Sequence, residues 1–180
     1  MRLQLTLVVA TMLLFSLTLA ANEWIFARTE FVRGVNWIYL PAGMRLLCTL
    51  LFAEAGAVGL LLISWLVSYY YFFPDDFIRA FVGGILASLA PYLIYRAARR
   101  MYDLHASLIN LTSKRLLVLI VAYSLASPLL HHLWFILHGD AGDILPSFFA
   151  MFTGDLAGTL IVVYAITLAL WLAARADRPR

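Results

Sequence analysis

The sequence predicts an all-α membrane protein, a bundle of about six transmembrane helices forming a single domain over residues 1–180. Of the 180 residues, 64% are hydrophobic and 13% are charged, whereas soluble domains average about 45–50% apolar and about 25% charged residues. This composition excludes a soluble globular domain and, because disordered chains are poor in apolar residues, a disordered chain as well. Cys48 is the only cysteine, which excludes a disulfide within the chain.

Apolar runs and their breaks define the helices in order. The first run, 3–21, has no charge, and we interpret it as a retained helix. A cleaved signal peptide is the alternative, although a secretory apolar region usually has only about 7–15 residues. Residues 35–73 are too long for one span and suit two, with a turn at Ala53-Glu54-Ala55-Gly56. The predicted helices are therefore 3–21, 36–53, 55–73, 76–97, 113–138 and 146–174.

The basic residues predict the orientation of these spans. Cytoplasmic loops are enriched in Lys and Arg, and six spans with both termini cytoplasmic place nine of the 13 basic residues on the inner side. We therefore expect a multi-pass membrane protein with both termini in the cytoplasm. The excess positive charge lies at helix ends, where it meets anionic lipid, so the lipid bilayer is the expected partner and nucleic acid is not.

Asp155 and Arg45 are the candidate ligand-binding pair. Asp155 lies about nine residues into the last predicted helix, roughly 14 Å from its outer end. An acid at that depth usually faces the protein interior with a partner, and it marks either a proton or ligand site or a structural polar contact. Arg45 is about 6 Å into the second helix, so it could pair with Asp155 or extend outward to the lipid headgroups.

The segment before Arg45 supplies the other candidate ligand-binding residues, Trp37, Tyr39, Pro41 and Gly43. A helix that starts at Pro41-Ala42-Gly43 has unpaired backbone N–H groups, and with Arg45 one turn later this end would suit an anionic group. Trp37 and Tyr39 could wall such a pocket. The alternative is an ordinary helix start with interfacial aromatic anchors.

Small residues four apart predict close helix packing. Gly154 and Gly158 flank Asp155 at this spacing, and Gly83 and Gly84 begin similar rows in the fourth helix. These rows can pack within one protomer or between protomers, so a homo-oligomer is one expected assembly.

Three histidines, His131, His132 and His138, lie at the outer end of the fifth helix. Their spacing lacks the i, i+4 pair of a helical zinc site, which leaves them weak metal candidates; an interfacial polar cap is the stronger interpretation. We therefore expect no bound metal and no cofactor. Serines lie in the spans without a histidine placed to activate them, and no catalytic motif is present, so we do not expect an enzyme.

Two segments resemble the MASE1 family of bacterial integral membrane sensory domains. In that family a Trp-Pro-Pro-Ala/Ser-Gly segment opens a helix and Gly-Asp-x-x-Gly occurs in a late helix; the matching residues are Trp37, Pro41, Ala42, Gly43, Gly154, Asp155 and Gly158. Three residues separate Trp37 from Pro41 here. The resemblance implies a membrane-embedded sensor in a bacterial inner membrane. Family members have about eight spans and a fused output domain, so this chain would be a stand-alone relative that signals through a partner or has lost signalling.

Three functions are compatible with these features. We favour a membrane-embedded small-ligand-binding or sensory module that acts through a partner protein. A non-catalytic accessory or scaffold subunit of a larger inner-membrane complex is the first alternative. The second is the substrate-binding component of a small-molecule uptake system, which rests on size and span number alone.

Overall fold

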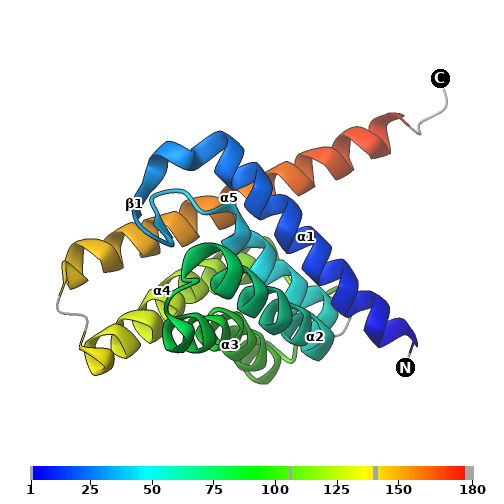
Figure 1. Cartoon of the computed structure of the whole chain (residues 1–180). Helices are drawn as coiled ribbons and strands as arrows, with labels where there is room; N and C mark the ends of the chain where they lie inside the picture. Colours follow the sequence, from blue (N-terminus) through cyan, green and yellow to red (C-terminus); the bar gives the residue numbers. More distant parts are fainter. Residues whose placement is uncertain (1, 106, 140–141, 177–180) are drawn as a thin grey trace.

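The computed structural model describes residues 2–105, 107–139 and 142–176, and it consists of five long apolar helices packed into a bundle (Figure 1). The long helices are α1 (Arg2–Phe26), α2 (Leu40–Val67), α3 (Phe77–Tyr102), α4 (Ser113–His138) and α5 (Ile144–Ala176). All five are long and apolar enough to cross a membrane. These five helices indicate a multi-pass membrane protein.

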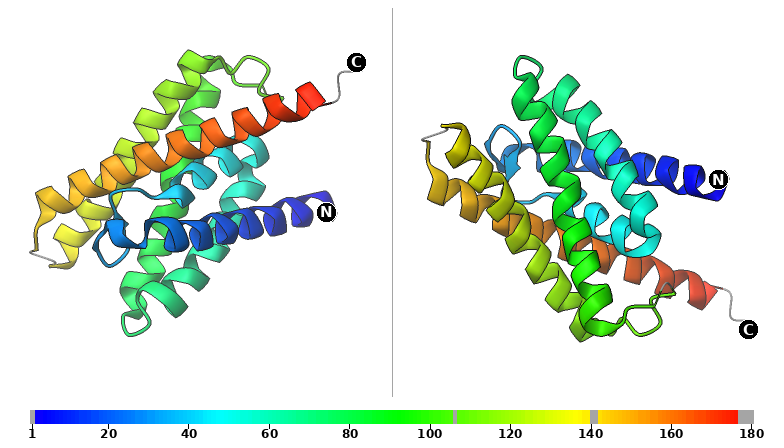
Figure 2. Two further views of the ribbon diagram at one scale, coloured as in Figure 1. Left: turned by 90° about the horizontal axis from the view of Figure 1, so that it is seen from above. Right: turned by 90° about the horizontal axis from the view of Figure 1, so that it is seen from below.

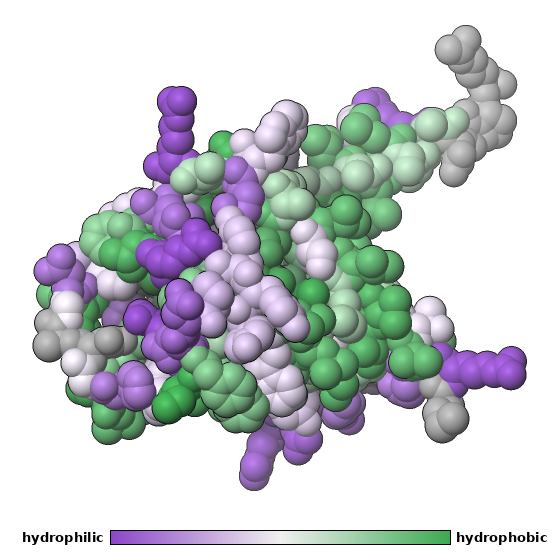
Figure 3. All heavy atoms as spheres, in the orientation of Figure 1, coloured by the Kyte–Doolittle hydropathy of each residue, from purple (hydrophilic) through white to green (hydrophobic). Residues whose placement is uncertain are grey.

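Polar and apolar side chains are distributed as expected for a protein surrounded by lipid. Large apolar residues such as Leu3, Leu13 and Leu17 of α1 are exposed, whereas Asn22 and Asp155 are buried. Hydrophobic surface covers α1 and much of α5, and hydrophilic surface gathers at the end of the bundle that carries β1 (Figure 3). Many large apolar side chains thus face outward while some polar and charged ones are buried, which is unusual for a soluble protein.

The predicted helix over 36–53 starts later than expected, at Leu40, because a short hairpin precedes it. The 3-10 turn η1 (Ala27–Thr29) leads into strand β1 (Glu30–Val32), which pairs antiparallel with β2 (Val35–Asn36). Gly34, at φ +82°, makes the turn between the strands. Pro41 is tolerated in the first turn of the helix, where its missing N–H would be unpaired in any case. Tyr39, which precedes the helix, has extended backbone at φ −133° and ψ 90°.

Helix α2 contains the break expected between the predicted helices 36–53 and 55–73. Ala53 has φ 52° and ψ −126°, outside the helical region. A Cβ atom on Gly56 would collide with the carbonyl of Cys48 and would lie 3.2 Å from Cα of Thr49. Residues eight apart in a continuous helix are separated by about 12 Å along its axis. The chain therefore folds back at Ala53, and the two halves of α2 point in different directions (Figure 2).

The remaining helices differ from the prediction mainly at their ends. The span expected at 55–73 continues past Val67 as a turn of π-helix, η2 (Ser68–Phe72), and those expected at 3–21 and 76–97 extend to Phe26 and Tyr102. The helix expected at 113–138 coincides with α4. The described structure therefore has five long helices, one of them broken, in place of six separate ones. Residues 177–180, with two of the arginines assigned to the inner side, lie outside the described residues.

The core lies between α1, the two halves of α2, α3 and α4. Phe15, Leu46, Leu60 and Tyr123 are among its fully buried side chains. Helix α5 joins this core only with its first half, because residues 164–176 are exposed. In Figure 1 the last turns of α5 project past the bundle on the same side as the first turns of α1.

Candidate functional site

The extended segment before α2 lies directly on α5. The backbone N–H of Tyr39 donates a hydrogen bond to the carbonyl of Gly154 at 3.1 Å. A Cβ atom on Gly154 would collide with the carbonyl of Asn36, and one on Gly158 with that of Tyr39. The two glycines predicted to pack against a helix therefore admit a stretch of non-helical backbone, which is tolerated in a membrane protein where it is buried inside the protein.

The start of α2 is closed by α1. The side-chain oxygen of Asn22 accepts a hydrogen bond from the backbone N–H of Leu40 at 2.8 Å, and the N–H of Ala42 donates to the carbonyl of Tyr39. A Cβ atom on Gly43 would lie against Val162. At this helix start, which the sequence suggested as an anion site, these backbone N–H groups are thus bonded within the protein. Arg45 is the residue of this segment whose side chain could still contact a ligand.

Arg45 is held between two aromatic rings inside the bundle. Its guanidinium carbon lies 5.3 Å from the centre of the Phe15 ring and 5.2 Å from that of Tyr39, within the range of cation–π attraction. One terminal nitrogen donates a hydrogen bond to the Tyr39 hydroxyl at 3.4 Å. Its Nε has no hydrogen-bond partner among the described residues. Only 8% of Arg45 is exposed, so the guanidinium does not extend to the headgroups.

Asp155 faces the same interior from α5. It is 1% exposed, and one of its carboxylate oxygens has no hydrogen-bond partner in the described part of the chain. Arg45 and Asp155 are close enough to interact electrostatically, yet no hydrogen bond or ion pair joins the two side chains. Burying both groups without a direct bond between them is costly.

A cavity of about 70 Å³ lies between the hairpin and the five long helices, with both groups in its wall. Arg33 is an exposed residue and Arg45 a buried one, so the cavity extends from the hairpin end into the bundle. Its polar and charged lining residues are Arg33, Asn36, Tyr39, Arg45, Ser64, Ser68, Arg79, His131 and Asp155.

The predicted site residues divide into two groups. Tyr39, Arg45 and Asp155 meet in the cavity, whereas Trp37, Pro41 and Gly43 do not line it. Trp37 is 45% exposed and packs edge-on against Phe31. Pro41 and Gly43 are buried at the start of α2.

The other predicted positions also separate. Gly84 accommodates the indole of Trp65. Gly83 lines the cavity, and a Cβ atom added to it would have no atom within 4 Å. His131 lines the cavity, and its Nδ1 donates to the carbonyl of Ser127 at 2.9 Å. His132 bonds in the same way to Pro128, and His138 stacks on Trp134. Within the described residues, no three metal-ligating side chains form a group that could hold an ion.

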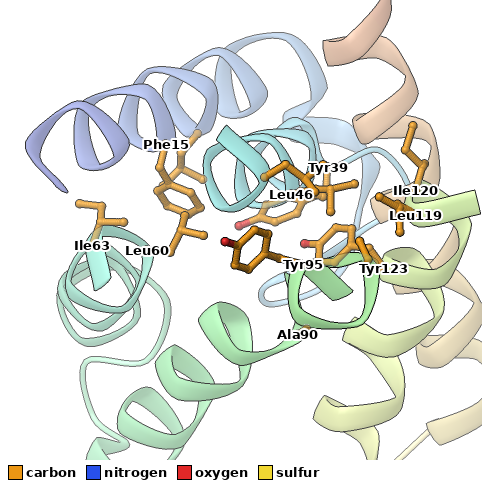
Figure 4. Packing of buried hydrophobic residues seen from close by; sticks show 14 of the residues in the cluster. Phe15, Tyr39, Leu46, Leu60, Ile63, Ala90, Tyr95, Leu119, Ile120 and Tyr123 are labelled. Atoms are coloured by element: carbon orange, nitrogen blue, oxygen red, sulfur yellow. The ribbon is translucent and has the colours of Figure 1, made fainter. Parts of the chain in front are cut away.

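Sequence reasoning missed the polar stripe that α4 presents to this region. Tyr123, Ser127 and His131 are four residues apart and therefore lie on one face of the helix, and all three are buried. Tyr123 is an electrostatic neighbour of both Arg45 and Asp155. Figure 4 shows Tyr39, from the segment before α2, with Tyr95 of α3 and Tyr123 of α4 close to the first turns of α2. The i, i+4, i+8 spacing of polar residues in an apolar helix is the signal that could have identified this face.

No protein-family model matches the chain, and neither a curated protein nor a solved structure is significantly similar to it.

Proposed function

We propose that the protein is a non-catalytic, membrane-embedded binding module for a small ligand, and that it passes on the bound state through a partner protein. The observation that carries the proposal is the buried cavity whose wall contains both Arg45 and Asp155, each with an atom that lacks a hydrogen-bond partner within the described residues. Ionisable side chains inside a membrane bundle are rare and usually mark a ligand or ion pathway. The resemblance to MASE1 sensory domains favours the same function and stays a prediction.

The proposed topology has six passes, with both termini in the cytoplasm of a bacterial inner membrane. The fold-back at Ala53 supports it, because the reversal makes α2 cross towards one side and return. The first turns of α1 and the last turns of α5 lie at the same end of the bundle in Figures 1 and 2, as an even number of passes requires. The excess of basic residues on the proposed inner side agrees with this orientation.

Native mass spectrometry of the protein extracted gently from its own membrane tests the proposal. The wild type is expected to carry a bound small molecule that Asp155→Asn loses. Asp143→Asn is the matched control, because Asp143 is an exposed acid at the start of α5 and its loss should leave the adduct in place. Circular dichroism and size-exclusion chromatography establish that Asp155→Asn folds.

A wild type without any small molecule would contradict the proposal. If a stoichiometric protein partner accompanies the empty protein, the scaffold alternative replaces it. An adduct that persists in a folded Asp155→Asn variant would place the ligand outside the cavity and would also contradict the proposal.

A further inference from the structure

Positive charge predominates in the wall of the cavity. Three arginines line it, Arg33, Arg45 and Arg79, against the single carboxylate of Asp155. Arg33 is exposed, Arg79 is partly buried and Arg45 is buried, so the arginines are distributed from the surface end of the cavity to its interior. Arg45 and Asp155 offset each other, and the two outer arginines then favour an anion entering from the hairpin end.

The polar atoms left without partners also favour an anion. Arg45 Nε, Asn36 Nδ2 and Ser64 Oγ can donate hydrogen bonds, and none has a partner among the residues described. Asp155 Oδ2 also lacks a hydrogen-bond partner among the described residues, and as a carboxylate oxygen it can accept a hydrogen bond. All four residues line the cavity and are buried. The wall thus offers several donors and one charged acceptor.

The size of the cavity limits the ligand. A volume of about 70 Å³ has room for several water-sized spheres at about 10–15 Å³ each. A ligand of about four or five non-hydrogen atoms suits this space.

From charge, donors and size together we propose that the cavity binds a small monovalent oxyanion that retains one O–H group, such as bicarbonate or dihydrogen phosphate. The unprotonated oxygens accept from Arg45, Asn36 and Ser64, and the O–H donates to Asp155. An anion without an O–H group would place an oxygen lone pair against the Asp155 carboxylate. This inference rests on the proposed function and specifies its ligand.

The test measures thermal stabilisation and binding by the purified full-length protein in phosphatidylcholine nanodiscs. The probes are sodium bicarbonate, sodium phosphate, sodium formate, which has a carboxylate and no O–H, and sodium chloride at equal ionic strength. Bicarbonate or phosphate is expected to raise the melting temperature, with formate and chloride far weaker.

Variants then assign the contacts. Arg45→Gln is expected to weaken bicarbonate or phosphate binding at least tenfold, since a hydrogen bond to a charged group is lost. Arg45→Lys keeps the positive charge and is the check that the variant site still folds. Asp155→Asn is expected to weaken binding of the protonated oxyanion about tenfold and to leave formate binding unchanged or stronger. The control is Arg175→Gln, because Arg175 lies in the exposed last turn of α5.

Three results would overturn the inference. Equal stabilisation of wild type and Arg45→Gln would indicate a general salt effect. Formate binding as tightly as bicarbonate and phosphate would remove the role of the O–H group. If native mass spectrometry finds an Asp155-dependent ligand that is neutral or cationic, the anion inference is wrong and the proposed function stands. If it finds no bound ligand at all, both the inference and the proposed function are wrong.

A lipid phosphate could supply the same chemistry. Phosphatidic acid is a phosphate monoester with an O–H group, and phosphatidylcholine is not. Phosphatidic acid in the nanodiscs would then abolish binding of the soluble oxyanion by the wild type. The effect of chloride on the melting temperature of Arg45→Gln would stay unchanged. That pair of results identifies the lipid headgroup as the source of the protonated oxyanion.

Discussion

The backbone N–H of Tyr39 donates to the carbonyl of Gly154, at 3.1 Å, and this bond joins the start of α2 to the middle of α5. Tyr39 in turn accepts a hydrogen bond from Arg45 through its hydroxyl, and Asp155 follows Gly154 in the chain. One backbone contact between residues 115 positions apart in the sequence thus helps to bring the two oppositely charged groups to the wall of the same cavity.

We predict that Gly154→Ala and Gly158→Ala strongly destabilise the protein. An added methyl group at either position would collide with a backbone carbonyl, of Asn36 or Tyr39, and backbone cannot move aside as a flexible side chain can. The expected cost is at least about 1–3 kcal/mol each, as for overpacking, measured by thermal unfolding in detergent.

Gly83→Ala is the matched control for these two variants. Its added Cβ would meet no atom within 4 Å, and replacing glycine by alanine inside a helix usually stabilises by about 0.5–1 kcal/mol. A Gly154→Ala protein as stable as Gly83→Ala would show that the segment 36–39 does not lie on α5.

Ala53→Gly is expected to stabilise the protein. Ala53 has φ 52° and ψ −126°, a conformation that costs a non-glycine residue about 1–3 kcal/mol and that glycine adopts freely. In an unbroken helix the same change would destabilise by about 1 kcal/mol. The sign of the change in unfolding free energy therefore tests the fold-back.

Asn22→Ala is expected to cost about 1–2 kcal/mol of stability. Its side-chain oxygen is the acceptor for the buried N–H of Leu40, and a buried donor left unpaired carries this penalty. Thr18→Ala, in the same helix, is the control, because the Thr18 hydroxyl bonds only to carbonyls of its own helix. Chemical denaturation should separate the two variants, and equal losses would refute the capping role.

Arg45 and Asp155 are expected to be energetically coupled. Arg45→Met leaves the Asp155 carboxylate without the guanidinium that faces it, at a cost of about 3–5 kcal/mol if the charge stays buried. Combining it with Asp155→Asn should cost less than the sum of the single changes in a double-mutant cycle. Arg175→Met combined with Asp155→Asn should be additive within about 0.5 kcal/mol, because the residues share no partner. Additivity of both pairs would contradict the coupling.

Cysteine labelling tests the proposed topology. In a Cys48→Ala background, Asp75→Cys between η2 and α3 is expected to react with a membrane-impermeant maleimide in intact cells, and Lys114→Cys only after lysis. If the N-terminus is cytoplasmic and α2 crosses the membrane once, without the fold-back, this pattern is reversed. The two labelling sites therefore distinguish six passes from five.

Much of the fold could be predicted from local sequence because lipid imposes a simple rule on it. Long apolar runs become helices, since every backbone group must be hydrogen-bonded where water is absent, and α4 coincides with its expected range. Glu54 and Gly56 marked the fold-back in α2. The hairpin over 30–36 was missed because its strands are short and its pairing depends on a turn at Gly34.

For the candidate site, the sequence determined which residues are out of place in a membrane, namely Arg45 and Asp155, because a charge inside an apolar run is recognisable without any structure. The tertiary structure decided what lies around them. It enclosed Tyr39, Asn36, Ser64 and His131 in the same cavity, excluded Trp37 from it, and left the two charges facing each other without a direct bond. Those relationships depend on how five helices and one extended segment pack, and helical spacing along a single chain does not encode distances between helices.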